Sequence, residues 1–330
     1  MTQDHIKKEA LFNEVKGSLF EYLVAMKLAR KSGIELNFID SIDRNYRTVL
    51  TQQDRMVRQF YPEMLLFLDQ VSDLTASNLS EYLKDPIKDI KLLGKFSNSS
   101  MSGQIHEADL LLELATRSVP VSLKLNKQNA FVNTKSGGIK SFFEQYFPIA
   151  GDEQTSFNSL VDAEFQRMAH ELHALSDMEY NGSFSMWVEA GKSELPGELE
   201  PLEREVLKRF YARIAQRMHD ILHSAQESSP EEFKISLPAL MGFSAKDILQ
   251  VICFHDFKTN KAPVIEIHTM EELTPGLESI RMKPFGQTSS VEFEVGPWDL
   301  QIRVKPMNKF TTTAIKINCS VRFRSRTSDS

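Results

Sequence analysis

Apolar residues at helical spacing dominate the first part of the chain. Between residues 6 and 31 they recur mostly every three or four positions, which predicts a long amphipathic helix. Residues 44–93 continue with helical patterns, in which Pro62 and Pro86 mark breaks or first turns. The N-terminal part is therefore expected to be mainly helical.

The pattern changes further along the chain. Residues 157–180 and 198–226 predict two more helices, whereas alternating or β-branched runs from residue 231 onward predict strands. These runs are ILQVICF, APVIEIH, VEFEV, LQIRVKP and AIKINCSVRF. We therefore expect a mixed region at 1–150, a helical region at 151–230 and a β-rich region at 231–330.

Two short strands in the mixed region carry an acid and an amine. The aliphatic run at 110–115 predicts one strand, with Asp109 at its head, and a second strand follows Pro120. Strand side chains alternate between faces, so Ser122 shares a face with Lys124. A carboxylate and a lysine on one sheet surface are the minimal equipment for metal-assisted phosphodiester hydrolysis.

Polar loops flank this strand pair. The Ser- and Gly-rich residues 97–103 precede it, and the loop Ser136-Gly137-Gly138 opens a helix at 139–147. Neither loop has the strand-loop-helix fingerprint of a P-loop or Rossmann phosphate site. Chemistry based on those two nucleotide-binding motifs is thus not expected.

Length and composition describe an ordinary globular protein. The chain has 330 residues, of which 41% are hydrophobic, enough for a sizeable core. It has two cysteines, Cys253 and Cys319, both in apolar runs, which excludes a structural zinc site of the cysteine type. We find no long uncharged apolar stretch and no signal peptide, so a cytoplasmic location is expected.

Charge is distributed unevenly along the chain. The formal net charge is −6, yet residues 301–330 hold seven basic residues against Asp329 alone. That segment therefore carries +6, which leaves −12 for the rest of the chain. Residues 121–143 form a second basic stretch without acids. Basic segments beside a carboxylate site suit a phosphate-backbone ligand, although a single charge run is usually a solvated face. The basic residues of the two stretches are Lys124, Lys127, Lys135, Lys140, Arg303, Lys305, Lys309, Lys316, Arg322, Arg324 and Arg326.

Three motifs, taken in order, resemble a known nuclease family. The helical run Lys16-Gly17-x-x-Phe20-Glu21 is followed by Glu107-Ala-Asp109 opening a strand and by Val121-Ser-Leu-Lys124 in the next strand. This combination resembles the PD-(D/E)xK nuclease superfamily and, within it, type II restriction endonucleases. The basic segment at 300–323 resembles a terminal segment of several restriction-enzyme families. The resemblance implies an α/β (α+β) fold with a mixed central sheet flanked by helices, a helical insertion and a β-rich C-terminal part.

The resemblance also implies roles for individual residues. Asp109 matches the metal-binding aspartate, Lys124 the lysine that positions or activates the attacking water, and Glu21 the acid contributed by the first helix. Ser122 departs from the pattern because it stands where the family usually has a second carboxylate. Some restriction enzymes with this serine recruit a glutamate from the following helix, where this chain has Glu144. Other acids that are open for that place are Glu21, Glu107 and Glu113.

The function that the resemblance implies is a Mg²⁺-dependent DNA endonuclease of restriction type acting on double-stranded DNA. Magnesium commonly needs only one or two protein carboxylates, because waters and substrate phosphate complete its coordination. A palindromic target would call for a homodimer with two-fold symmetry. The side chains expected to contact nucleic acid are Lys127, Lys135, Lys140, Arg303, Lys305, Asn308 and Lys309.

Two other readings remain open. The missing carboxylate at Ser122 and the net acidity favour a non-catalytic nucleic-acid-binding or assembly protein on a degenerate nuclease core. His219 and His223, four residues apart on a helix, have the spacing of a zinc-binding pair, with Asp220 in the usual glutamate position. The sequence shows no persuasive third ligand for zinc, and His170 and His173 have less support still.

Overall fold

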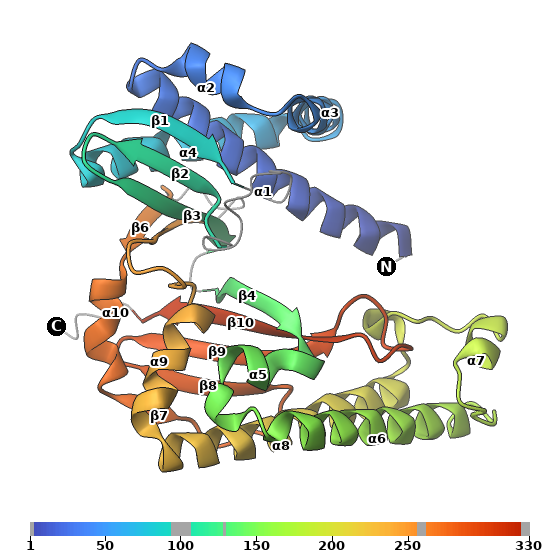
Figure 1. Cartoon of the computed structure of the whole chain (residues 1–330). Helices are drawn as coiled ribbons and strands as arrows, with labels where there is room; N and C mark the ends of the chain where they lie inside the picture. Colours follow the sequence, from blue (N-terminus) through green and yellow to red (C-terminus); the bar gives the residue numbers. More distant parts are fainter. Residues whose placement is uncertain (1–2, 94–106, 128–129, 256–261, 325–330) are drawn as a thin grey trace. The chain divides into compact units, whose positions relative to one another are not determined.

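The computed structural model describes residues 3–93, 107–127, 130–255 and 262–324, with side chains for residue 12 and from residue 14 onward. The chain is a mixed α and β protein that forms two compact units (Figure 1). The first unit comprises Met1–Ala130 and Phe243–Glu272, and the second Phe131–Gly242 and Leu273–Ser330. The expected loop at 97–103 and Arg326 lie outside the described residues.

The first unit combines helices with a mixed five-stranded sheet of order β1-β2-β3-β5-β6. Neighbouring strands are antiparallel except β3 and β5, which are parallel. The chain therefore leaves this sheet after β3, builds much of the second unit and returns as β5. The elements are α1 (Gln3–Lys31), α2 (Glu35–Ser41), α3 (Arg44–Phe60), α4 (Pro62–Leu83), β1 (Ile87–Leu92), β2 (Leu110–Leu114), β3 (Ser118–Lys127), β5 (Leu249–His255) and β6 (Val264–His268).

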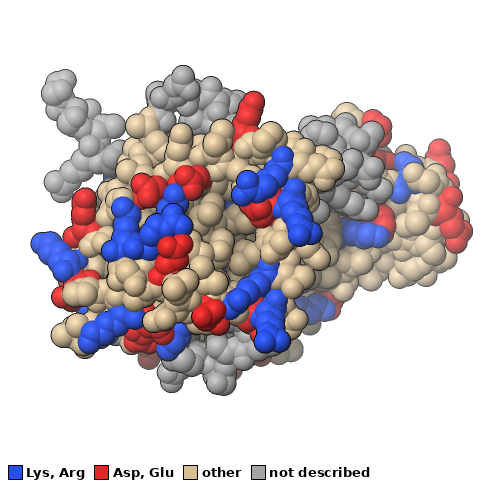
Figure 2. Space-filling view, turned by 90° about the horizontal axis from the view of Figure 1, so that it is seen from above, with Lys and Arg blue, Asp and Glu red and all other residues tan. Residues whose placement is uncertain are grey.

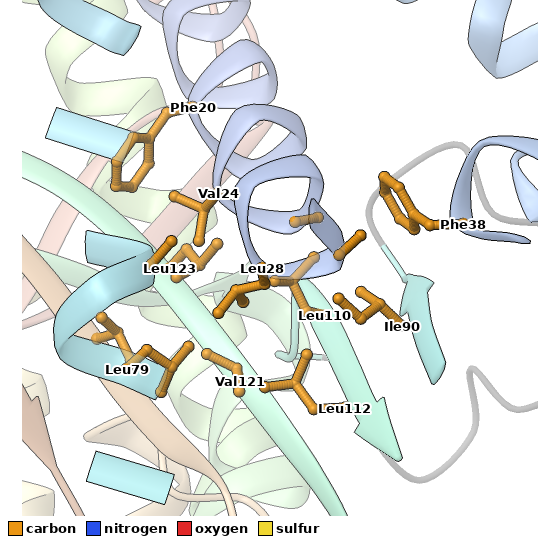
Figure 3. Packing of buried hydrophobic residues seen from close by; sticks show 14 of the residues in the cluster. Phe20, Val24, Leu28, Phe38, Leu79, Ile90, Leu110, Leu112, Val121 and Leu123 are labelled. Carbon is orange, nitrogen blue, oxygen red and sulfur yellow. The ribbon is translucent and has the colours of Figure 1, made fainter. Parts of the chain in front are cut away.

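Helices α1 and α4 cover one face of this sheet (Figure 3). Phe20 and Val24 of α1 are buried together with Leu110 of β2 and Val121 and Leu123 of β3. Each such side chain contributes about 1.5–3 kcal/mol by leaving water. This packing holds α1 over the β2–β3 pair that carries Asp109 and Lys124.

The helix predicted through residue 93 is wrong at its end. Lys84 has a φ of 59°, which ends α4, and residues 87–92 form β1 instead. Ile87 and Ile90 are both buried although they are three residues apart, because the register with β2 shifts between Ile87 and Asp89. A β-bulge of this kind gives a strand the apolar spacing of a helix.

The second unit packs helices against an antiparallel five-stranded sheet of order β4-β10-β9-β8-β7. The expected helices near 157–180 and 198–226 are confirmed as α6 and α8. Its elements are β4 (Val132–Gly138), η2 (Ile139–Ser141), α5 (Phe142–Tyr146), η3 (Pro148–Ala150), α6 (Glu153–Ala174), α7 (Ser185–Glu189), η4 (Pro196–Glu198), α8 (Pro201–Ser228), α9 (Pro230–Leu240), β7 (Ile280–Met282), β8 (Ser290–Val295), β9 (Trp298–Pro306) and β10 (Ile315–Phe323). Helix α10 (Met270–Leu277) begins in the first unit and ends in the second.

Two local predictions in the second unit are wrong. Ser136-Gly137-Gly138 is the end of strand β4, where Gly137 pairs with Ile317 of β10 and lies under the Tyr146 ring. Residues 230–240 form α9, because Pro230 and the acidic residues after it suit the first turn of a helix. Strands at the C-terminal end begin only at β5.

The division of the chain differs from the expected breaks at 150 and 230. Residues 131–150 belong to the second unit, and β5 and β6 join the sheet of the first. Strand pairing decides this, since a parallel partner of β3 has to come from a distant part of the chain. None of the described helices is long and apolar enough to cross a membrane.

Candidate functional site

The hairpin of β2 and β3 places Asp109 beside Ser122. Leu110 pairs with Val121, and the N–H of Asp109 donates to the carbonyl oxygen of Val121 at 2.8 Å. Asp109 thus continues the ladder by one position, directly across from Ser122. Because opposite residues in an antiparallel pair share a face, Asp109, Ser122 and Lys124 lie on the same side of the sheet.

Three donors converge on one oxygen of Asp109. Its Oδ2 accepts the N–H of Leu123 at 2.6 Å, Nζ of Lys124 at 3.2 Å and Oγ of Ser122 at 3.4 Å. The other carboxylate oxygen, Oδ1, has no partner among the described residues. The predicted meeting of acid and amine is confirmed, with one oxygen held and the other available to a ligand.

Further acids surround Lys124. Burial by itself would lower the pKa of Lys124, but the carboxylates of Asp109, Glu21 and Glu107 attract its ammonium, and the net effect raises that pKa. Burial, with the charges of Glu21 and Asp109, likewise raises the pKa of Tyr46 on α3. Glu21 therefore acts on the same site, as the position of α1 over the hairpin requires.

Helix α1 also brings a cation near the far end of β3. Burial lowers the pKa of Lys16, and the nearby charge of Lys127 lowers it further. Lys16 lies five residues before Glu21 on α1, and Lys127 is exposed at the end of β3. The region around Lys124 is thus acidic toward Asp109 and basic toward Lys127.

A buried polar row crosses the sheet beside Asp109. Ser122 pairs in register with Gln250 of β5, which pairs in turn with His268 of β6. These three side chains are only 4%, 2% and 6% exposed. The ring nitrogens of His268 contact Glu266 at 3.0 Å and Glu272 at 3.1 Å. Gln250 was missed by sequence reasoning, and its signal is a polar residue inside the apolar run ILQVICF.

The alternative carboxylates differ in place. Glu144 lies exposed on α5 in the second unit, so the unit that carries Asp109 does not supply it. Glu113 is engaged with Lys91 at 3.4 Å and with the hydroxyl of Ser118. Glu107 accepts the N–H of Ser244 at 3.4 Å and also acts on Lys124. Of the four candidates, Glu21 and Glu107 are those whose charge reaches Lys124.

The donor set fits a divalent cation in part. Across the described ranges, no three His, Cys, Asp or Glu side chains gather closely enough to hold a metal ion. One oxygen of Asp109 together with Glu21 still matches Mg²⁺, which is often bound by one or two carboxylates and otherwise by water and phosphate. A zinc site made only of protein ligands, which needs at least three, is not formed in this part of the chain.

The two histidine pairs belong to packing. The rings of His219 and His223 are stacked at 6.1 Å, and that of His219 also lies 5.7 Å from Phe285. His173 is buried and its Nδ1 lies 2.8 Å from the carbonyl oxygen of Ala169. Nothing described around either pair supplies further metal ligands.

Several of the predicted nucleic-acid contacts are already paired within the second unit. Lys309 forms an ion pair with Glu194, and Lys140 one with Asp162 at 2.8 Å. Lys135 lies over the Tyr146 ring at 5.4 Å. Arg322 and Arg324 of the basic tail contact the buried Asp299 at 2.7 and 3.6 Å.

Arg303 and Lys305 of β9 differ, since they make no ion pair with any described acid, while Asn308 is exposed in the turn after β9. On the face drawn in Figure 2, Lys and Arg side chains lie among Asp and Glu side chains, so this face is not a surface of one sign. Of the predicted contacts in the second unit, Arg303 and Lys305 thus remain the cations with charge available to a ligand.

Comparison of the chain with models of protein families, with curated proteins and with solved structures gives no match. The arguments about function therefore rest on the residues and their geometry.

Proposed function

We propose that this protein is a Mg²⁺-dependent endodeoxyribonuclease of restriction type that hydrolyses phosphodiester bonds in double-stranded DNA. The observation that supports it most is the convergence of Lys124, Ser122 and the Leu123 N–H on one oxygen of Asp109. This arrangement fixes the carboxylate and leaves Oδ1 without a partner among the described residues. It brings together, in one unit, the three residues to which the family resemblance assigns chemistry: Asp109, Lys124 and Glu21.

Each residue has a separate task in this proposal. Asp109 and Glu21 would hold Mg²⁺, which when bound polarises a phosphoryl oxygen and lowers the pKa of a coordinated water. Lys124 orients the attacking water or stabilises charge that develops on the phosphate, as preorganised cations do. The acids around Lys124 keep its ammonium protonated, so its role is that of a cation and hydrogen-bond donor.

Substrate contacts in this proposal come from cations whose charge is not neutralised within the fold. Arg303 and Lys305 meet that condition in the second unit, and Lys127 is exposed beside the candidate site in the first. Contacts of this kind supply affinity through phosphate and make binding sensitive to salt. Cleavage of a palindromic site on both strands would use a homodimer.

A second candidate is a nucleic-acid-binding or assembly protein without catalysis. It is favoured by Ser122, which brings a hydroxyl where a carboxylate would complete a stronger metal site, and by the lack of three clustered metal ligands in the described chain. It predicts salt-sensitive DNA binding that survives Lys124→Ala.

A cleavage assay on plasmid and phage DNA with Mg²⁺ separates the two candidates. Asp109→Ala and Lys124→Ala are each expected to lower the rate by about 100-fold or more, as loss of a transition-state contact commonly does. Lys91→Ala is the matched control, because Lys91 is a cation of the same sheet that pairs with exposed Glu113. Intact DNA under broad conditions, or equal rates in the three variants, would refute the nuclease proposal.

A further inference from the structure

A pocket of about 610 Å³ lies in the second unit, away from the residues discussed so far in the first. Its walls come from helix α8, the turn at η4, residues 287–289 before β8 and the end of β9. At this end of the sheet, β8 has only just begun, and the N–H of Val304 donates to the carbonyl oxygen of Ser289 at 2.8 Å. The gap between α8 and the sheet is therefore open here rather than filled by a strand. The volume lies in the range typical of small-molecule sites.

Four cations and no acid line this pocket. Arg204 and Lys208 come from one face of α8, and Arg303 and Lys305 from β9. Lys208 is paired with Glu205 outside the pocket at 2.5 Å. Arg204 donates to the carbonyl oxygen of Leu199 at 2.8 Å, which neutralises none of its charge.

Arg303 and Lys305 have no acidic partner in the described chain. Burial lowers the pKa of Lys305, and the charges of Lys316 and Arg303 lower it further, so this lysine sits in an excess of positive charge. Like charges gathered on a partly buried wall are costly unless an anion joins them. The pocket is thus built for a ligand that carries more than one negative charge.

The rest of the wall is apolar and includes an aromatic ring. Leu207 and Tyr211 of α8 face this space together with Val304 and Pro306 of β9. Tyr211 is 7% exposed, and its hydroxyl is buried without a hydrogen-bond partner. An inorganic anion would leave this apolar surface uncovered. A ligand with a flat apolar body and a charged end would use both parts of the pocket.

We propose that the pocket binds a nucleoside phosphate, with the phosphate on Arg303, Lys305 and Arg204 and the base against Tyr211 and Leu207. The same chemistry is carried by a free nucleotide and by a nucleotide unit of a DNA chain. The site goes beyond the proposed nuclease chemistry, because it needs neither Asp109 nor a divalent cation. Arg204 and Lys208 add to the DNA-facing cations of β9 a second wall that the sequence did not indicate.

Calorimetric titration of the full-length protein, without divalent cations, tests this site. Deoxyadenosine monophosphate and adenosine triphosphate are the probes, and adenosine and inorganic phosphate are the partial ligands. The nucleotides are expected to bind at least tenfold more tightly than either partial ligand. The double variant Arg303→Gln/Lys305→Gln is expected to weaken nucleotide binding at least tenfold. Lys208→Gln provides a second, independent removal of a pocket cation if the double variant does not fold.

Arg217→Gln is the matched control, because Arg217 lies on the same helix outside the pocket and pairs with Glu153 at 2.7 Å. It is expected to change nucleotide affinity less than twofold. A single-stranded oligonucleotide and a duplex form the second arm of the experiment. If free mononucleotide binds and displaces neither DNA, the ligand is a free nucleotide; if it competes with DNA, the pocket takes a nucleotide unit of the chain.

Three results would overturn the proposal. The first is that no nucleotide titrates while oligonucleotide binding is unchanged in the double variant. The second is that inorganic phosphate binds as tightly as the nucleotides. The third is that the pocket variants and Arg217→Gln weaken binding equally. Absence of DNA cleavage would leave all of these measurements valid, so failure of this site and failure of the nuclease proposal are distinguishable.

Discussion

The energetic coupling of Asp109 and Lys124 is the most direct test of the candidate site. Asp109→Asn keeps the size of the side chain and an oxygen for the Leu123 N–H but removes the negative charge, and Lys124→Met removes the ammonium while keeping an apolar stem. The two charged side chains are 16% and 29% exposed, and their ion pair spans 3.2 Å. A hydrogen bond to a charged group contributes about 1.5–3 kcal/mol, against about 0.2–1 kcal/mol for an exposed ion pair. Partial exposure places the coupling between these ranges, at about 1–2 kcal/mol.

Urea unfolding of the parent, both single variants and the double variant at pH 7 gives this coupling as a double-mutant cycle. Both tryptophans, Trp187 and Trp298, lie in the second unit, so far-UV circular dichroism is needed to follow the first. The control cycle uses Lys91 and Glu113, an ion pair of the same sheet that is 45% and 29% exposed and spans 3.4 Å. Its coupling is expected to stay below about 0.5 kcal/mol. Additive effects at Asp109 and Lys124, or a coupling no larger than in the control, would refute the electrostatic account of the site.

Three further predictions concern the second unit. Hydrogen bonds from Lys309 and Thr311 lower the pKa of Glu194, so Glu194→Gln should cost about 1 kcal/mol at pH 7, and this cost should disappear as pH falls below the ordinary value of 4.5; thermal unfolding from pH 7 to 3 checks this, and a cost that persists at pH 3 would contradict it. Gly296 has a φ of 57°, and a Cβ there would lie 2.6 Å from the Cα of Gly276, so Gly296→Ala should lower stability by more than about 2 kcal/mol, whereas Gly197→Ala, with open space around it, should change it far less. Tyr211→Phe removes a buried hydroxyl that has no partner and should raise the melting temperature by a few degrees, corresponding to about 1 kcal/mol; a lower melting temperature would show that the hydroxyl is satisfied.

Much of the local structure followed from the sequence because its causes are local. The long first helix, the β2–β3 pair and helices α6 and α8 were predicted from apolar spacing and turn residues. Segments failed where a neighbour overrode the local pattern, as when the β-bulge gave β1 a helical spacing of apolar residues. Ser136-Gly137-Gly138 failed similarly, since only its pairing with β10 makes it a strand.

The contact between Asp109 and Lys124 was predictable for the same reason. The two residues lie on adjacent strands of one hairpin, and strand alternation alone places their side chains on one face. Glu21 required the packing of α1 over the sheet, and Gln250 and His268 entered the polar row only through the parallel pairing of β5 with β3. The roles of these residues in catalysis stay predictions.

The sequence by itself determined the helices, the hairpin and the acid and amine that face each other on it, because these depend on residues close together in the chain. Only the tertiary structure decided which charges are neutralised. Asp299, Glu194 and Asp162 engage cations that the sequence offers as free, while Arg303 and Lys305 meet Arg204 and Lys208 across a pocket without acids. Charge pairing depends on distances of a few ångströms between segments far apart in the chain, and these distances are set by how the helices and sheets pack.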